Sequence, residues 1–162
     1  MTDAPAQGRS VVFASLLMAL MLTIWPLPEA IAPFRPDWSA LFLIYWIMAL
    51  PHRFNVGTAW CVGLILDVLT GSLLGQHAIA LAITGVLVAM SHLRVRVFPV
   101  WQQAMTVMVL LAVNELILIL VEGATGQLYD LEWRWAPIVT GMLFWPWVLF
   151  FLRSLRRRFD VS

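Results

Sequence analysis

Apolar residues fill most of this chain and fall into six blocks separated by short polar or proline-containing stretches. The blocks cover residues 11–27, 38–50, 57–74, 77–91, 104–121 and 136–152. A helix needs about 17 to 25 residues to cross the hydrocarbon core of a bilayer. Six such helices would use nearly the whole chain. The pattern therefore predicts an all-α integral membrane protein, a six-transmembrane-helix bundle forming one polytopic domain over residues 1–162 with a basic tail at 153–162.

The second block is shorter than the others. Its run from Trp38 to Leu50 lies in the length range where a buried or re-entrant helix competes with a true span. It would cross a bilayer only by borrowing flanking residues, so its length alone leaves both alternatives open.

Composition supports the membrane assignment. The chain is 62% hydrophobic and only 12% charged, whereas soluble domains carry about 25% charged residues. Its mean hydropathy is +0.88. The connections between the blocks are too short to contain a soluble domain of about 50 residues. We therefore expect the protein to act in or beside the bilayer.

Arginine supplies every basic side chain and predicts the orientation, because cytoplasmic loops collect Lys and Arg near helix ends. With six spans and a cytoplasmic N-terminus, only Arg35 and Arg134 lie outside, with the acidic residues Glu29, Asp37, Asp130 and Glu132. The arginines then on the cytoplasmic side are Arg9, Arg53, Arg94, Arg96, Arg153, Arg156, Arg157 and Arg158. This asymmetry requires an even number of spans, so it counts block 38–50 as a span and places both termini in the cytoplasm.

The first block has an alternative interpretation as a signal peptide. Arg9 precedes an apolar run, and Ala30-Ile31-Ala32 resembles a cleavage site. The run is long for a signal peptide, and a further hydrophobic chain follows it. We therefore expect an uncleaved helix.

Asp67 stands inside the apolar block 57–74, with Gly63, Gly71 and Gly75 at four-residue intervals around it. An aspartate at the centre of a membrane helix costs about 2.5 to 3.5 kcal/mol unless it is protonated or paired. Residues four apart share a helix face, and small residues on one face allow close helix packing. The stripe predicts a close-packing groove containing a carboxyl group. Asp67 would be a buried packing residue, part of a polar cavity or ion path, or a partner contact.

Asn114 and Glu115 are polar residues in the middle of block 104–121. Glu115 lies at a similar depth to Asp67, so the two carboxyl groups could share a proton or be unrelated. The chain contains no GxSxG, HExxH or Walker motif, and its histidines have no metal-ligand spacing. The sequence therefore predicts a protein that is not an enzyme and that carries no cofactor or metal.

The stretch YWIMALPHRFNVGTAWCVGLILDVLTGSLLG at 45–75 resembles the rod shape-determining protein MreD family of Gram-negative bacteria. FRPDW at 34–38, WQQA at 101–104 and WPW at 145–147 before the basic tail are further points of similarity. These motifs occur in the family's order and spacing, and they extend over essentially the whole chain.

The resemblance implies a non-enzymatic component of the bacterial inner membrane that supports cell elongation, rod shape and lateral peptidoglycan synthesis. It implies pairing with an MreC-like single-span membrane protein. Through that partner it implies a link between the MreB filament, a class B penicillin-binding transpeptidase and a SEDS-type glycosyltransferase. It also implies a fold like that of the substrate-binding subunits of energy-coupling-factor transporters. Nucleic acid is not among the expected partners.

Exposed polar or small residues on a membrane bundle are costly unless a partner covers them. The candidates for helix packing or partner contact are Tyr45, Trp46, Gly63, Asp67, Gly71, Gly75, Trp145, Pro146 and Trp147. Candidates for contact with headgroups or a cytoplasmic partner are His52, Arg53, Arg94, Arg96, Arg156, Arg157 and Arg158. Anionic lipid attracts such a basic tail by about 1 kcal/mol per arginine. The alternative function is a small-molecule-binding or transport subunit that uses the polar groove around Asp67.

Overall fold

The structure is a computed structural model that describes residues 4–127 and 131–161, and within these ranges all regular secondary structure is helical. The helices are α1 (Ala4–Ile24), η1 (Ala32–Phe34, a short 3-10 helix), α2 (Trp38–Ala49), α3 (Val56–Thr70), α4 (Gln76–Val95), α5 (Val100–Thr125) and α6 (Ala136–Arg158). The predicted all-α class with six helical blocks is confirmed. Helix α3 ends four residues earlier than the predicted block, and α5 extends four residues beyond its block at each end.

Helix α2 forms the centre of the bundle. Every residue from Ser39 to Met48 is buried, and α1, α4 and α6 pack around it. A helix that is apolar on all sides is typical of a protein core or a membrane span, and the contacts of α2 place it in the core of this bundle. At 1.5 Å per residue its 12 residues give a length of about 18 Å, which is less than a bilayer core of about 30 Å.

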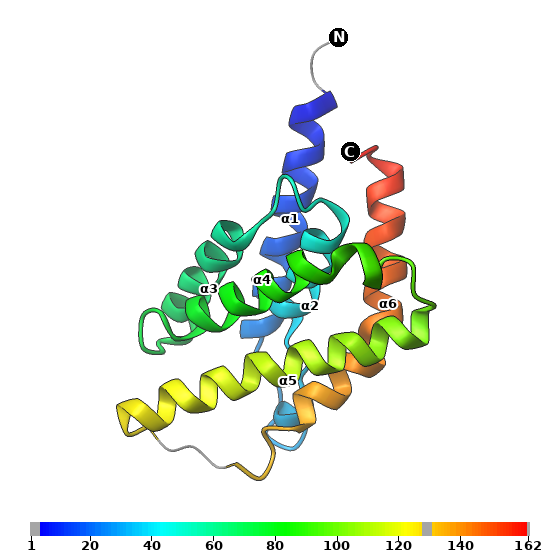
Figure 1. The fold of residues 1–162 in the computed structure, drawn as a ribbon. Coiled ribbons are helices and arrows are strands. Elements are labelled where there is room, and N and C mark those ends of the chain that lie inside the picture. Colours follow the sequence, from blue (N-terminus) through cyan, green and yellow to red (C-terminus); the bar gives the residue numbers. More distant parts are fainter. Residues whose placement is uncertain (1–3, 128–130, 162) are drawn as a thin grey trace.

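Consecutive helices run in opposite directions between two ends of the molecule (Figure 1). Helices α1 and α2 are antiparallel, since Trp46 Nε1 donates to Ser15 Oγ at 2.9 Å near one end and the hydroxyls of Thr23 and Ser39 lie 2.9 Å apart near the other. The start of α1 and the end of α6 lie at the same end of the bundle, where a Cβ atom built on Gly8 would lie 3.6 Å from the side chain of Val161.

The two ends differ in charge. One end, here called the arginine-rich end, contains the start of α1, the loops at 50–55 and 96–99, and the end of α6. It carries the eight arginines that the charge pattern grouped together. The opposite end contains Arg35, Arg134 and most of the acidic side chains. Asp130, predicted for the same side, lies outside the described residues.

Among the residues that the structure describes, three helices are long and apolar enough to cross a membrane by length and composition, namely α4, α5 and α6. Two shorter apolar helices occur at Gly8–Ile24 and Val56–Thr70. Helix length therefore supports membrane crossing directly for half of the bundle.

Helices α3 and α4 form a tight antiparallel hairpin, which is the most extensive helix pair of the bundle. Gly63 makes the close approach possible, because a Cβ atom there would lie 2.3 Å from the Cα atom of Ala78 and would overlap the backbone of α4. The sequence prediction of close packing is therefore supported at Gly63.

We expect Gly63→Ala to lower the melting temperature of the purified protein, because α4 must move away to accommodate the methyl group. Overpacking of this kind costs about 1 to 3 kcal/mol. The matched control is Gly123→Ala, where the added Cβ meets no atom within 4 Å. That variant should unfold at or slightly above the wild-type temperature, since alanine favours helix more than glycine does. Equal melting temperatures for the two variants would contradict the close approach.

Candidate functional site

Asp67 lies in the last turn of α3, and its side chain is completely buried. Its carboxylate is directed at the first residues of α4. Oδ2 accepts a hydrogen bond from the backbone N–H of Gly75 at 2.8 Å, and Oδ1 accepts from the backbone N–H of His77 at 2.8 Å. The Ser72 hydroxyl donates to Oδ1 at 2.9 Å, and Nδ1 of His77 lies 2.8 Å from it. The free N–H groups of a helix N-terminus favour a negative charge, which explains how a buried carboxylate is tolerated here.

The predicted four-residue stripe is wrong at its far end. Helix α3 ends at Thr70, and Gly71 and Gly75 lie in the turn that follows, with φ values of +66° and +102°. These glycines are needed because only glycine adopts this left-handed backbone readily. Asp67 therefore marks a helix end and not the middle of a span. The helix that covers it is α4 of the same chain, so an external partner cannot touch its side chain.

A second polar cluster connects α5 with the segment before α6. The guanidinium of Arg134 donates to Glu115 Oε1 at 2.6 Å and to both carboxylate oxygens of Glu122. Gln76 Nε2, at the start of α4, donates to Glu122 Oε1 at 2.7 Å. The hydrogen bonds with Glu122 and then Glu115 raise the pKa of Arg134, so its positive charge is retained.

These contacts correct the hypothesis that Asp67 and Glu115 share a proton. Glu115 is paired with Arg134, and Asp67 is paired with His77 and the start of α4. Each carboxylate has its own hydrogen-bond donors. Asp67 bonds with the turn between α3 and α4, whereas Glu115 lies further along the chain, in α5.

The buried Asn114 lies beside this cluster. Its Nδ2 atom donates to Asp37 Oδ2 at 3.5 Å, and Thr84 Oγ1 donates to its Oδ1 atom at 3.4 Å. Asp37 also accepts from the backbone N–H of Ala40 at 3.0 Å and caps the start of α2. The cluster therefore joins α2, α4 and α5 at the opposite end of the molecule.

A cavity of about 360 Å³ opens beside these groups. Its polar lining consists of Thr23, Arg35, Asp37, Thr70, His77, Glu115, Glu122 and Arg134. Asp67 does not line it. Within residues 4–127 and 131–161, no group of three or more His, Cys, Asp or Glu side chains is arranged to hold a metal ion.

Sequence reasoning missed Glu122, Gln76 and the ion pairs that Arg134 forms within the molecule. Glu115 and Glu122 are seven residues apart and therefore share a helix face, a signal that was lost because the predicted block ended at residue 121. The charge pattern places Arg134 on the outer side but does not indicate a partner for it. No sequence signal pointed to Gln76.

The aromatic candidates separate into buried and exposed residues. Tyr45, Trp46 and Trp145 are buried and serve helix packing. Pro146 is partly buried inside α6. Trp147 is 76% exposed and is the one of these aromatic side chains that remains accessible to lipid or a partner.

The basic candidates also separate into residues that line a cavity and residues that do not. Arg96, Arg156 and Arg157 line one cavity at the arginine-rich end, together with Arg153, which was not among the candidates. His52, Arg53, Arg94 and Arg158 are not part of that cavity lining.

Comparison with known proteins gives a consistent result over nearly the full length. The family model described as rod shape-determining protein MreD matches residues 6–155. A curated relative, rod shape-determining protein MreD of Haemophilus influenzae, is 29% identical over 150 residues, which is 91% of this chain and 91% of the relative. No solved structure matches significantly.

We expect Asp67→Ala to destabilise the protein by about 1 to 3 kcal/mol, because it leaves the buried N–H groups at the start of α4 without an acceptor. Thermal unfolding in detergent, followed by circular dichroism, measures this loss. Glu132→Ala is the matched control, since it removes an exposed carboxylate. An unfolding temperature equal to that of wild type would show that the cap is not important for stability.

Arg134→Gln is expected to lower stability by up to about 3 kcal/mol, because it leaves Glu115 and Glu122 without their positive partner. Arg53→Gln removes an exposed arginine and should have little effect. The double variant Arg134→Gln/Glu122→Gln should recover part of the loss in the same unfolding assay. No recovery in the double variant would argue against the ion-pair explanation.

Proposed function

The chain belongs to the family of the rod shape-determining protein MreD and has a role in rod-shape determination, and from this premise we propose that it is a non-catalytic scaffold of the cell-elongation machinery in the bacterial inner membrane. The observation that carries the proposal is the family match over residues 6–155, which includes all but the two ends of the chain. The scaffold binds an MreC-like single-span protein and supports lateral peptidoglycan synthesis.

All six helices cross the membrane in this proposal, and both termini are cytoplasmic. The support is the separation of eight arginines at one end from Arg35 and Arg134 at the other, which follows the positive-inside rule. Helix α2 is too short to cross alone. It nevertheless carries the chain from Asp37, at the opposite end, to Leu50 near the arginine-rich end, inside a shell of other helices.

Partner binding takes place in the plane of the membrane. The described residues form helices with short connections, so the available contact surface is mainly the outer faces of the helices. Through the single-span partner the scaffold connects indirectly to the MreB filament, a class B penicillin-binding transpeptidase and a SEDS-type glycosyltransferase. Trp147, the exposed aromatic residue of α6 among the candidates, is the contact residue we propose.

The alternative function, a small-molecule-binding or transport subunit, has less support from the contacts. Both carboxylate oxygens of Asp67 already accept hydrogen bonds from within the chain, and this residue does not line the neighbouring cavity. The likeness to substrate-binding subunits of energy-coupling-factor transporters stays a prediction.

Affinity purification of the tagged protein from native membranes tests the scaffold proposal. We expect mass spectrometry to find a single-span membrane protein and wall-synthesis enzymes with the wild type, relative to an unrelated tagged membrane protein. Trp147→Ala should lower recovery of the single-span protein several-fold, because aromatic anchors often dominate interface energy. Its unfolding temperature should be unchanged.

The matched control is Trp101→Ala, which removes a tryptophan that is 70% exposed on α5. It should leave recovery at the wild-type level. Absence of any single-span partner with the wild type would overturn the scaffold proposal. Equal recovery by both tryptophan variants would overturn only the contact at Trp147.

A further inference from the structure

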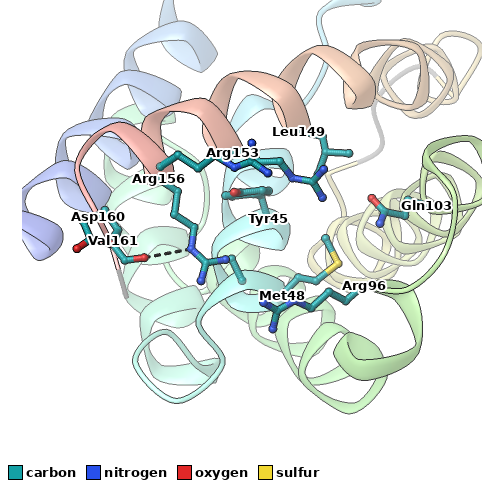
Figure 2. Close-up of a pocket in the computed structure, with 11 residues that line it drawn as sticks. Tyr45, Met48, Arg96, Gln103, Leu149, Arg153, Arg156, Asp160 and Val161 are labelled. Atoms are coloured by element: carbon teal, nitrogen blue, oxygen red, sulfur yellow. Dashed lines mark hydrogen bonds between the residues drawn. The ribbon is translucent and has the colours of Figure 1, made fainter.

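A cavity of about 520 Å³ lies at the arginine-rich end, between the end of α2, the turn joining α4 to α5, and the end of α6 (Figure 2). Its volume lies within the range of about 300 to 1,000 Å³ that is typical of small-molecule sites. It is lined by Tyr45, Met48, Ala49, Arg96, Gln103, Leu149, Arg153, Arg156, Arg157, Asp160 and Val161. We call it the arginine pocket.

The sequence of α6 places three of the four arginines together. Residues 153, 156 and 157 are spaced i, i+3 and i+4, so they share one face of the helix. Arg158 falls on a different face and does not line the pocket. In Figure 2 the side chains of Arg153 and Arg156 extend from α6 on either side of Tyr45.

The fourth arginine is held by the turn between α4 and α5. Nε2 of the buried Gln103 donates to the backbone oxygens of Val95 and Phe98, at 3.1 Å each, and these residues flank Arg96. Figure 2 shows Arg96 near Met48, across the pocket from α6. The turn therefore presents a positive charge to the same space from the other side.

These four guanidinium groups lack carboxylate partners within residues 4–127 and 131–161, where every salt bridge involves Asp67, Glu115 or Glu122. Asp160 is the one acidic residue in the lining, and it forms none of those salt bridges. Arg156 uses Nε to donate to the backbone oxygen of Val161 at 3.1 Å.

Like charges gathered around one cavity repel each other, and a bound anion converts this repulsion into attraction. The planar guanidinium fork matches the geometry of phosphate oxygens and binds them through charge-assisted hydrogen bonds. Met48, Ala49 and Leu149 add apolar surface beside the arginines. Such a lining suits a phosphate group attached to a carbon-containing molecule.

We propose that the arginine pocket is a specific binding site for a phosphate group, carried either by an anionic lipid headgroup or by a soluble phosphorylated molecule. The site goes beyond the scaffold role and does not depend on the identity of the protein partner. It differs from diffuse attraction of a basic tail because it uses Arg96 and Arg153 and excludes Arg158.

The test uses the protein purified in detergent and titrated with two probes. Native mass spectrometry measures binding of dioleoylphosphatidylglycerol, with dioleoylphosphatidylcholine as the neutral reference. Inorganic pyrophosphate provides the soluble arm. We expect saturable binding of the wild type to at least one phosphate probe above the neutral reference, and about tenfold weaker binding by Arg153→Gln and by Arg96→Gln.

Two variants remove the same charge from the same end without altering the pocket. Arg158→Gln is the control for Arg153→Gln, and Arg94→Gln is the control for Arg96→Gln. Both controls should bind within about twofold of wild type. Circular dichroism checks that all four variants are folded, which is expected because these side chains are exposed.

The pattern across the probes distinguishes the two sources. Binding of phosphatidylglycerol that requires Arg96 and Arg153 supports the pocket with a lipid ligand. Binding of pyrophosphate with the same requirement, and no preference among the lipids, supports it with a soluble ligand. Equal losses in pocket and control variants would show diffuse electrostatic attraction and overturn the proposal, as would the absence of binding to either probe.

Discussion

The capping of α4 by Asp67 is the contact on which the arrangement of the bundle depends most. A carboxylate at the end of one helix accepts the first N–H groups of the next, so the chain can reverse within a short turn. Gly63 then allows the two helices to approach closely. Because the cap sets where α4 begins, it also places Gln76 against Glu122 of α5. A local turn is thus connected to the polar cluster of the opposite end.

The charged side chains are arranged differently at the two ends of the molecule. At the opposite end Arg134 is held between Glu115 and Glu122, so the polar groups largely satisfy one another. At the arginine-rich end four guanidinium groups surround one cavity with a single carboxylate in its lining. The first arrangement stabilises the connection between α5 and α6. The second is electrostatically incomplete within the described residues, and it is therefore the end where an anion would have the larger effect.

Burial decides which of the candidate residues can contact a partner directly. Tyr45 and Trp46 are candidates for helix packing or partner contact in the sequence, and both lie inside the bundle because α2 is surrounded by other helices. Of the alternatives that the sequence leaves open for Asp67, its complete burial favours the packing residue over the partner contact. Family membership gives a role in rod-shape determination, whereas burial shows which side chains can serve that role by direct contact. Trp147 remains accessible and Asp67 does not.

The sequence by itself determined the all-α class, the six helical blocks and the family, because apolar block length and motif order are properties of the chain alone. It also predicted the grouping of the arginines, because the order of the apolar blocks along the chain decides at which end of the bundle each arginine lies. Tertiary structure decided the rest. It ended α3 at Thr70, paired Glu115 with Arg134 and brought Arg96 to the arginines of α6. These outcomes depend on which helices are neighbours and on where each one ends. A single sequence does not encode that information in its periodicity, because a hydrophobic block has the same pattern whichever helix packs against it.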